Sequence, residues 1–235
     1  MIFSPLYLIM LAPAMLLGLW AQMRVKSTYH AALRQPASMS GASAARRLLD
    51  SAGLQRVDIE EVPGELSDHY DPRHKVLRLS QTIYHSRTMA SVGIAAHEAG
   101  HAIQDAKNYA PLMIRNAAVP AANFGSGISW VLFFIGLMIA QMSRTGGPLG
   151  QTLMIAGIVG FGCVVFFQVI NLPVEFDASA RANRQLVEYG IVHENEMGTV
   201  NKVLNAAALT YVAATLQAVL QMLYFIIRMV GTRRR

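Results

Sequence analysis

Four long apolar stretches dominate the pattern of hydrophobic and polar positions along the chain. They cover roughly Ile2 to Gln22, Ala117 to Gln141, Leu149 to Ile170 and Ala206 to Ile227. Each approaches or exceeds the ~20 residues that a helix needs to cross a hydrocarbon core of ~30 Å. No basic residue precedes the first stretch, and no clear small-residue cleavage site follows it before Arg24, so we expect a retained anchor rather than a signal peptide. The pattern therefore predicts four membrane-spanning helices.

The polar region after the first stretch has shorter patterns. Residues 40–54 are typical of an amphipathic helix, for which Ser40 is a suitable N-cap. The Ala-rich stretch from about Thr88 to Ala106 also suits a helix. Between them, Val57 to Ile59 and His74 to Leu79 alternate like extended segments, and we expect them to form a small β-hairpin or ribbon.

The composition agrees with a membrane protein. Of the 235 residues, 53% are hydrophobic and only 14% are charged, which sets the chain apart from ordinary soluble domains. The net charge is +6, but a basic cluster such as Arg233-Arg234-Arg235, directly after an apolar helix, favours lipid headgroups over nucleic acid. The single cysteine, Cys163, excludes a disulfide or a thiolate metal site within one chain. Any metal must therefore be held by histidines and carboxylates.

The string His97-Glu98-Ala99-Gly100-His101 is the strongest chemical signal. Positions four apart share one face of a helix, so His97 and His101 direct two imidazoles to one point, with Glu98 beside them. This is the HExxH zinc arrangement, in which the glutamate takes a proton from a metal-activated water. The alternative is two histidines that only satisfy polar needs in a packed helix. The similar string 193–197 has methionine in place of the second histidine and favours a solvated turn near a helix start.

A hydrolytic zinc site needs three protein ligands and one open position, so a third ligand must come from elsewhere. Two predicted spans separate His97 from residues 171–205, which therefore return to the same side of the membrane. There, Glu175 follows Pro173, a residue that can end one helix and start another. Asp177 lies about 200° further around a helix, so both carboxylates cannot face one metal. We expect Glu175 to be the ligand. The alternative is a helix-start carboxylate that complements the helix dipole.

Four strings carry a resemblance to a known family. They are LSDHYDPR (66–73), AAHEAGHAIQ (95–104), LPVEFDAS (172–179) and LNAAALTY (204–211). With them, the chain resembles the YugP-like family of bacterial membrane zinc metallopeptidases over nearly its whole length. More distantly, it is similar to the HExxH plus ExxxD arrangement of the HtpX and CAAX prenyl protease gluzincins. That likeness implies Glu175 as third zinc ligand and Glu98 as catalytic base. Ser179 replaces the Asp of ExxxD, so Ser179, Asp177 or a backbone carbonyl must orient the zinc-binding histidine.

The predicted fold class is mainly α: an integral membrane protein with about four transmembrane helices and a small α+β, gluzincin-like domain between spans one and two. We divide the chain into five parts. They are an N-terminal transmembrane anchor (1–23), a catalytic region with a β-hairpin and the HExxH helix (24–116), a transmembrane hairpin (117–170), a helical segment with the third ligand (171–205), and a C-terminal transmembrane helix with a basic tail (206–235).

The predicted function is that of a membrane zinc metalloendopeptidase with one Zn²⁺ ion, acting on peptides or membrane proteins, for example in membrane-protein quality control. Glu98 would pass the proton of the attacking water to the leaving amine. We expect the substrate to bind as an extra strand along Lys75 to Ser80, which could alternatively be a structural lid. Asp68, His69 and Asp71 are either turn residues or supports of the site. A non-catalytic scaffold with structural zinc would need a fourth ligand, for which His69 is the candidate.

Basic residues near the spans predict the orientation in the membrane. Those on the side of His97 are Arg24, Lys26, Arg34, Lys107, Arg115, Arg181, Arg184 and Lys202, and those on the other side are Arg144, Arg228, Arg233, Arg234 and Arg235. The larger number on the side of His97 favours a cytoplasmic site in a multi-pass protein of the bacterial inner membrane. The expected partners are the substrate and the lipid bilayer, without nucleic acid, and the sequence does not indicate an oligomeric state.

Overall fold

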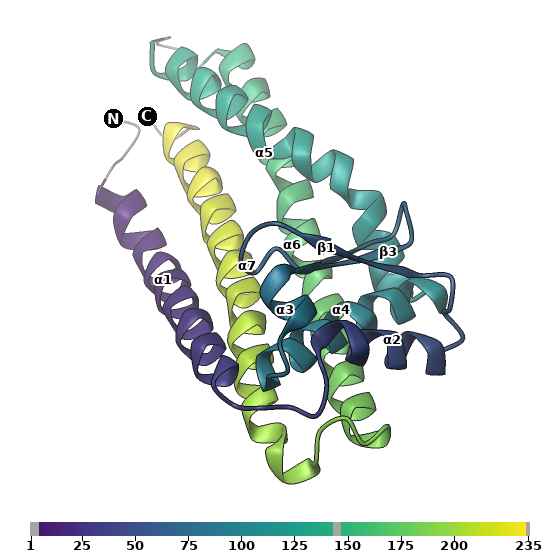
Figure 1. Ribbon diagram of the computed structural model, residues 1–235. Coiled ribbons are helices and arrows are strands. Elements are labelled where there is room, and N and C mark those ends of the chain that lie inside the picture. The colour runs from purple at the N-terminus through teal and green to yellow at the C-terminus, as the bar shows by residue number, and fades with distance from the viewer. Residues whose placement is uncertain (1–4, 143–146, 234–235) are drawn as a thin grey trace. The chain divides into compact units, whose positions relative to one another are not determined.

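The computed structural model describes residues 5–142 and 147–233, and the described chain is mainly helical (Figure 1). Its elements are α1 (Pro5–Leu33), α2 (Gly41–Ser51), β1 (Asp58–Val62), β2 (His69–Asp71), β3 (Val76–Ser80), α3 (Gln81–His85), α4 (Met89–Ala106), α5 (Ala110–Met142), α6 (Pro148–Glu188), the 3-10 turn η1 (Glu194–Glu196) and α7 (Met197–Arg233). The start of the first apolar stretch, at Ile2, and the basic residues Arg144, Arg234 and Arg235 lie outside the described residues.

Four of these helices, α1, α5, α6 and α7, are long and apolar enough to cross a membrane. They contain the described parts of the four predicted spans, so the predicted class, a mainly α membrane protein, is confirmed. The break expected at Pro173 is wrong, because α6 continues through this residue to Glu188. A proline removes only one backbone donor, and helices of membrane proteins tolerate it where neighbouring groups satisfy the freed carbonyl.

The chain divides into two compact units, each with its own core. We call the described residues of 1–19, 114–171 and 211–235 the membrane unit, and residues 20–113 and 172–210 the site unit. In the membrane unit, aromatic side chains dominate the core, where Phe133 and Phe225 stack with ring centroids 4.1 Å apart. Tyr7, Trp130 and Phe161 make further ring contacts in this cluster. Such rings bury large apolar areas and favour stacked or edge-to-face pairs.

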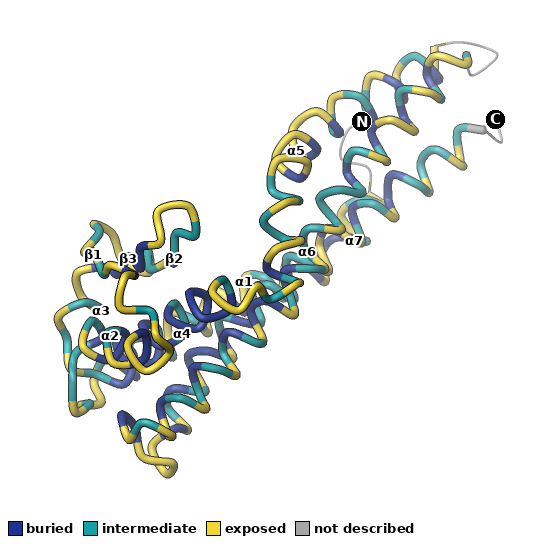
Figure 2. The backbone as a smooth tube through the Cα atoms, turned by 90° about the vertical axis from the view of Figure 1, so that its right-hand side faces the viewer, coloured by how far each residue is buried: buried dark blue, intermediate teal, exposed yellow. Residues whose placement is uncertain are grey.

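The core of the site unit is built around α4, which is buried along most of its length (Figure 2). Small alanines along this helix let α2 pack closely, and Leu48 and Leu49 of α2 are fully buried. The predicted N-cap Ser40 is confirmed, since its side chain accepts a hydrogen bond from the backbone N–H of Ser43. Thr88 caps α4 in the same way. Both caps satisfy helix N–H groups that have no partner within the helix.

A three-stranded sheet completes the site unit, with the strand order β1-β3-β2. β1 is parallel to β3, whereas β2 and β3 form an antiparallel pair. The two extended segments predicted from the sequence are therefore β1 and β3, and they do not form a hairpin with each other. The role expected for Lys75 to Ser80 as a substrate-binding edge is wrong, because β3 is the central strand and has neighbours on both sides. The free edges belong to β1 and β2.

Candidate metal centre

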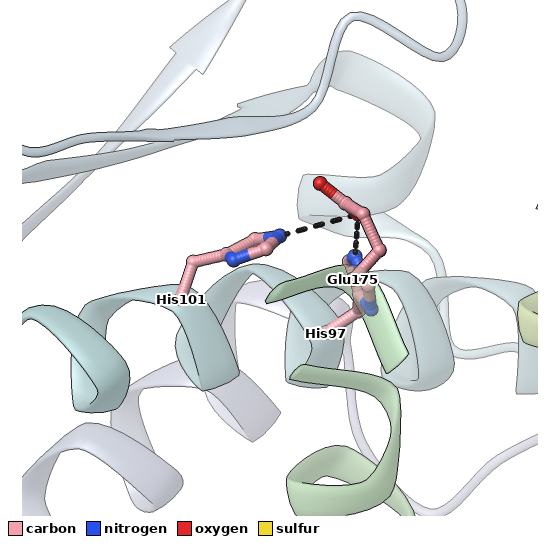
Figure 3. A group of neighbouring side chains, drawn as sticks. All are labelled: His97, His101 and Glu175. Carbon is pink, nitrogen blue, oxygen red and sulfur yellow. Dashed lines mark ion pairs between the residues drawn. The ribbon is translucent and has the colours of Figure 1, made fainter. Parts of the chain in front are cut away.

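Two helices bring three potential metal ligands together in the site unit (Figure 3). His97 and His101 lie on successive turns of α4 with ring centroids 4.8 Å apart. Glu175 reaches them from α6, and its Oε2 lies 3.3 Å from His97 Nε2 and 3.6 Å from His101 Nε2. One ligand atom from each residue lies within 4.8 Å of the other two. The structure thus unites the three residues that the sequence predicted as ligands, although Glu175 is far from the histidines in the chain.

The chemistry of this group fits a zinc ion. Glu175 is only 6% exposed, and its Oε2 has no hydrogen-bond partner among the described residues. A buried carboxylate oxygen without a hydrogen bond is costly, and a cation at this position would compensate its charge. Two imidazole nitrogens and one carboxylate form a ligand set that is common in catalytic zinc sites, where a fourth position stays open.

The other nitrogen of each imidazole also has a neighbour. Ser179 Oγ lies 3.1 Å from Nδ1 of His97, and Gln104 Oε1 lies 3.0 Å from Nδ1 of His101. Among the three candidates for the missing Asp of ExxxD, Ser179 is therefore the one that contacts His97. Asp177 instead accepts hydrogen bonds from Arg181 and from Gln104 Nε2. Such outer contacts orient metal-binding rings, which is how both Nε2 atoms come to face Glu175.

Gly100, inside the HExxH string, allows α4 and α6 to approach each other. A Cβ atom at this position would lie 2.8 Å from the backbone oxygen of Ala178, so a larger residue would force the helices apart. One turn after Gly100 on α4, the side chain of Gln104 donates a hydrogen bond to the backbone oxygen of Val174, which lies one turn before Ala178 on α6. The two helices therefore run in opposite directions through the contact, which places Glu175 opposite the histidines.

Glu98 lies beside the ligand group but is not a member of it. Its Oε2 accepts a hydrogen bond from the backbone N–H of Tyr70 on β2, at 3.1 Å. The Tyr70 hydroxyl donates in turn to Asp105 on α4, at 2.7 Å, and Lys75 donates to the same carboxylate. Burial raises the pKa of Glu98, against the opposing effect of His97 and His101. The structure thus holds one carboxylate oxygen of Glu98 in place and favours proton uptake by this group.

The acidic loop residues named from the sequence have local roles. Asp68 accepts hydrogen bonds from the backbone and hydroxyl groups of Ser80, and burial raises its pKa. Asp71 forms ion pairs with His74 and Arg78. His69 is exposed, and no fourth His, Cys, Asp or Glu joins the ligand group among the residues that the structure describes. His69 therefore does not lie with the three converging residues in the structure.

Two residues at this centre were not predicted from the sequence. Gln104 follows His101 by three positions, a spacing that places both side chains on one face of a helix, so this signal was available. The hydrogen bond from Tyr70 to Glu98 has no signal in the sequence, because the donor is the backbone N–H of Tyr70 and not its side chain. Any residue other than proline carries such a group.

Comparison with known proteins agrees with this geometry. The sequence model of a family described as "Putative neutral zinc metallopeptidase" matches residues 7–230. The chain belongs to this zinc metallopeptidase family. The chain is similar to "Putative membrane protease YugP" of Bacillus subtilis (strain 168). The two sequences are 42% identical over 223 residues, which cover 94% of this chain and 95% of the relative. No solved structure matches this chain. The resemblance seen in the sequence is thus confirmed, and the family implies both zinc and peptidase activity.

Proposed function

We propose that the protein is a membrane-embedded zinc metalloendopeptidase that holds one Zn²⁺ ion with His97, His101 and Glu175 and uses Glu98 as its general base. The observation that carries the proposal is the convergence of two Nε2 atoms and one buried carboxylate oxygen, which has no hydrogen-bond partner, at a single point. Membership of a zinc metallopeptidase family and similarity to a membrane protease support it.

The chain's own residues account for the proton transfers. When bound, zinc supplies a Lewis acid that acidifies water and polarises a carbonyl group. The Tyr70 N–H holds Glu98 through its Oε2, and the Glu98 carboxylate takes the proton of the attacking water. The same carboxyl group then gives this proton to the leaving amine. A pKa raised by burial suits both steps, because a group that titrates closer to the working pH can accept and release the proton.

A first experiment tests this function and its orientation together. Purified protein in detergent is expected to contain one zinc ion per chain and to cleave casein, and a chelator should abolish cleavage until zinc is restored. In bacterial membranes, we expect cleavage of added casein by inverted vesicles and not by right-side-out vesicles, since the excess of basic residues favours a cytoplasmic site. Protein that loads zinc but never cleaves a peptide would contradict the enzymatic function. Cleavage only by right-side-out vesicles would reverse the orientation.

The substrate is proposed to bind as an extended peptide along β2. This strand is an edge of the sheet, and it lies next to Glu98, which accepts a hydrogen bond from the backbone N–H of Tyr70. A strand edge next to the catalytic base can receive a substrate through main-chain hydrogen bonds. Membrane-protein quality control is the role we favour, because unfolded segments of membrane proteins offer such extended chains.

Backbone methylation of a cleaved peptide tests this binding mode. In an added strand only alternate amides face the partner, so methylation of these amides should lower kcat/KM by about 2- to 10-fold each, the value of one hydrogen bond. Methylation of the amides between them should have little effect. An equal effect at every position, or none at all, would argue against binding along β2.

A further inference from the structure

Gln104 is fully buried where α4 meets α6, and all of its polar groups are engaged. Its Nε2 donates to the backbone oxygen of Val174 and to Asp177 Oδ2, both at 2.8 Å. Its Oε1 lies 3.0 Å from Nδ1 of His101. One amide side chain thus contacts a ligand on α4 and the residue that precedes Glu175 on α6.

These contacts determine which way the amide points. A backbone carbonyl accepts hydrogen bonds only, and so does a carboxylate that is paired with an arginine, as Asp177 is with Arg181. The amide nitrogen, with two hydrogens, must therefore face Val174 and Asp177. The reversed amide would place its oxygen against two acceptors, Val174 O and Asp177 Oδ2, and its nitrogen against His101, so both hydrogen bonds to α6 would be replaced by contacts between acceptors.

The orientation of the amide fixes the proton of His101. Because the amide oxygen can only accept, Nδ1 of His101 must carry the hydrogen. In a neutral imidazole the other nitrogen, Nε2, then has a free lone pair. This is the atom that lies 3.6 Å from Glu175 Oε2. His97 is held differently, since the Ser179 hydroxyl next to it can donate or accept and does not select one tautomer.

We propose that Gln104 is a positioning residue of the metal centre: it fixes the tautomer of His101 that can bind the metal and links the α4 ligands to the α6 ligand. This inference rests on the proposed function, because it assigns Gln104 a role toward the same zinc ion. The link to α6 runs through the Val174 carbonyl, which is adjacent to Glu175 in the chain.

Two substitutions separate the two parts of this role. Gln104→Met keeps a similar length but removes all three hydrogen bonds, and we expect the zinc affinity to fall by about 10- to 100-fold. Gln104→Glu keeps an oxygen that accepts the Nδ1 hydrogen of His101 but loses both donors to α6. We therefore expect it to retain the tautomer and to bind zinc with an affinity between those of wild type and Gln104→Met.

The readouts are zinc affinity, from competition with a chelator, and the histidine tautomer, from long-range proton–nitrogen NMR spectra of the metal-free protein. With 7 histidines in the chain, selective labelling makes the spectra tractable, and a His101→Gln variant assigns the signal. At a pH where the imidazole of His101 is neutral, wild type and Gln104→Glu should show His101 protonated on Nδ1 only, whereas Gln104→Met should show a mixture of tautomers.

Gln221→Met is the matched control, because Gln221 is also buried, at 3% exposure, but lies in the membrane unit. It should bind zinc like wild type. Wild-type zinc affinity together with a single His101 tautomer in Gln104→Met would overturn the proposal. If that variant does not fold, mixed tautomers in Gln104→Glu would overturn it as well. A wild type that binds no zinc would refute the proposed function instead, and the tautomer would still report on Gln104 in the metal-free protein.

Discussion

Glu98→Gln is expected to lower kcat/KM for peptide cleavage by about 10²- to 10⁴-fold, the usual contribution of a general base, while the zinc content stays unchanged. The amide has nearly the shape of the carboxylate, and its oxygen can still accept the hydrogen bond from Tyr70. It cannot take up a proton from water near neutral pH. Because Glu98 is not one of the three converging ligands, its replacement leaves the metal site complete.

The measurement compares zinc content and casein cleavage for the purified variant and wild type. Glu194→Gln is a suitable control, since Glu194 occupies the string that starts like the motif but lies exposed on η1. This control should cleave casein like wild type. Cleavage at the wild-type rate by Glu98→Gln would remove Glu98 from the chemistry, and loss of its zinc would mean that this residue supports the metal.

Glu175→Gln should weaken zinc binding by more than about 100-fold, beyond the loss expected for a residue that only supports a ligand, and cleavage should be lost with the metal. The change removes the buried negative charge that faces His97 and His101 and leaves a neutral amide in its place. Titration with zinc against a competing chelator measures the affinity, and circular dichroism establishes that the helices are retained.

Glu188→Gln controls for this change, because Glu188 lies exposed near the end of the same helix. It should bind zinc with wild-type affinity. Unchanged zinc affinity in the Glu175 variant would mean that the third ligand comes from elsewhere. In that case the proximity of Glu175 to the imidazoles would reflect an ion pair within the protein.

The features that the sequence predicted correctly depend on local patterns. Hydrophobic length identified the long helices, and the capping residue Ser40 marked the start of α2. The spacing of His97 and His101 is also local, since four residues on a helix define one face. Glu175 is distant in the chain, and it was found because two spans must return the polypeptide to the same side of the membrane.

The features that could not be predicted from the sequence depend on contacts between distant segments. β2 has three residues, followed by a proline, a composition that is typical of a turn, and only its pairing with β3 makes it a strand. The continuity of α6 through Pro173 likewise depends on its surroundings. Ser179 was recognised as a departure from a motif, but its position next to His97 follows from the close approach of α4 and α6 at Gly100.

The separation of the ligands along the chain has a consequence for biogenesis. The ribosome makes α4 before α5, so the growing polypeptide first presents two imidazoles without the carboxylate. Glu175 becomes available only after a complete helical hairpin, α5 and most of α6, has been synthesised. A nascent chain that has not yet reached Glu175 therefore lacks the carboxylate of this group, and the proposed peptidase centre assembles only after the polypeptide of α5 and most of α6 has been made.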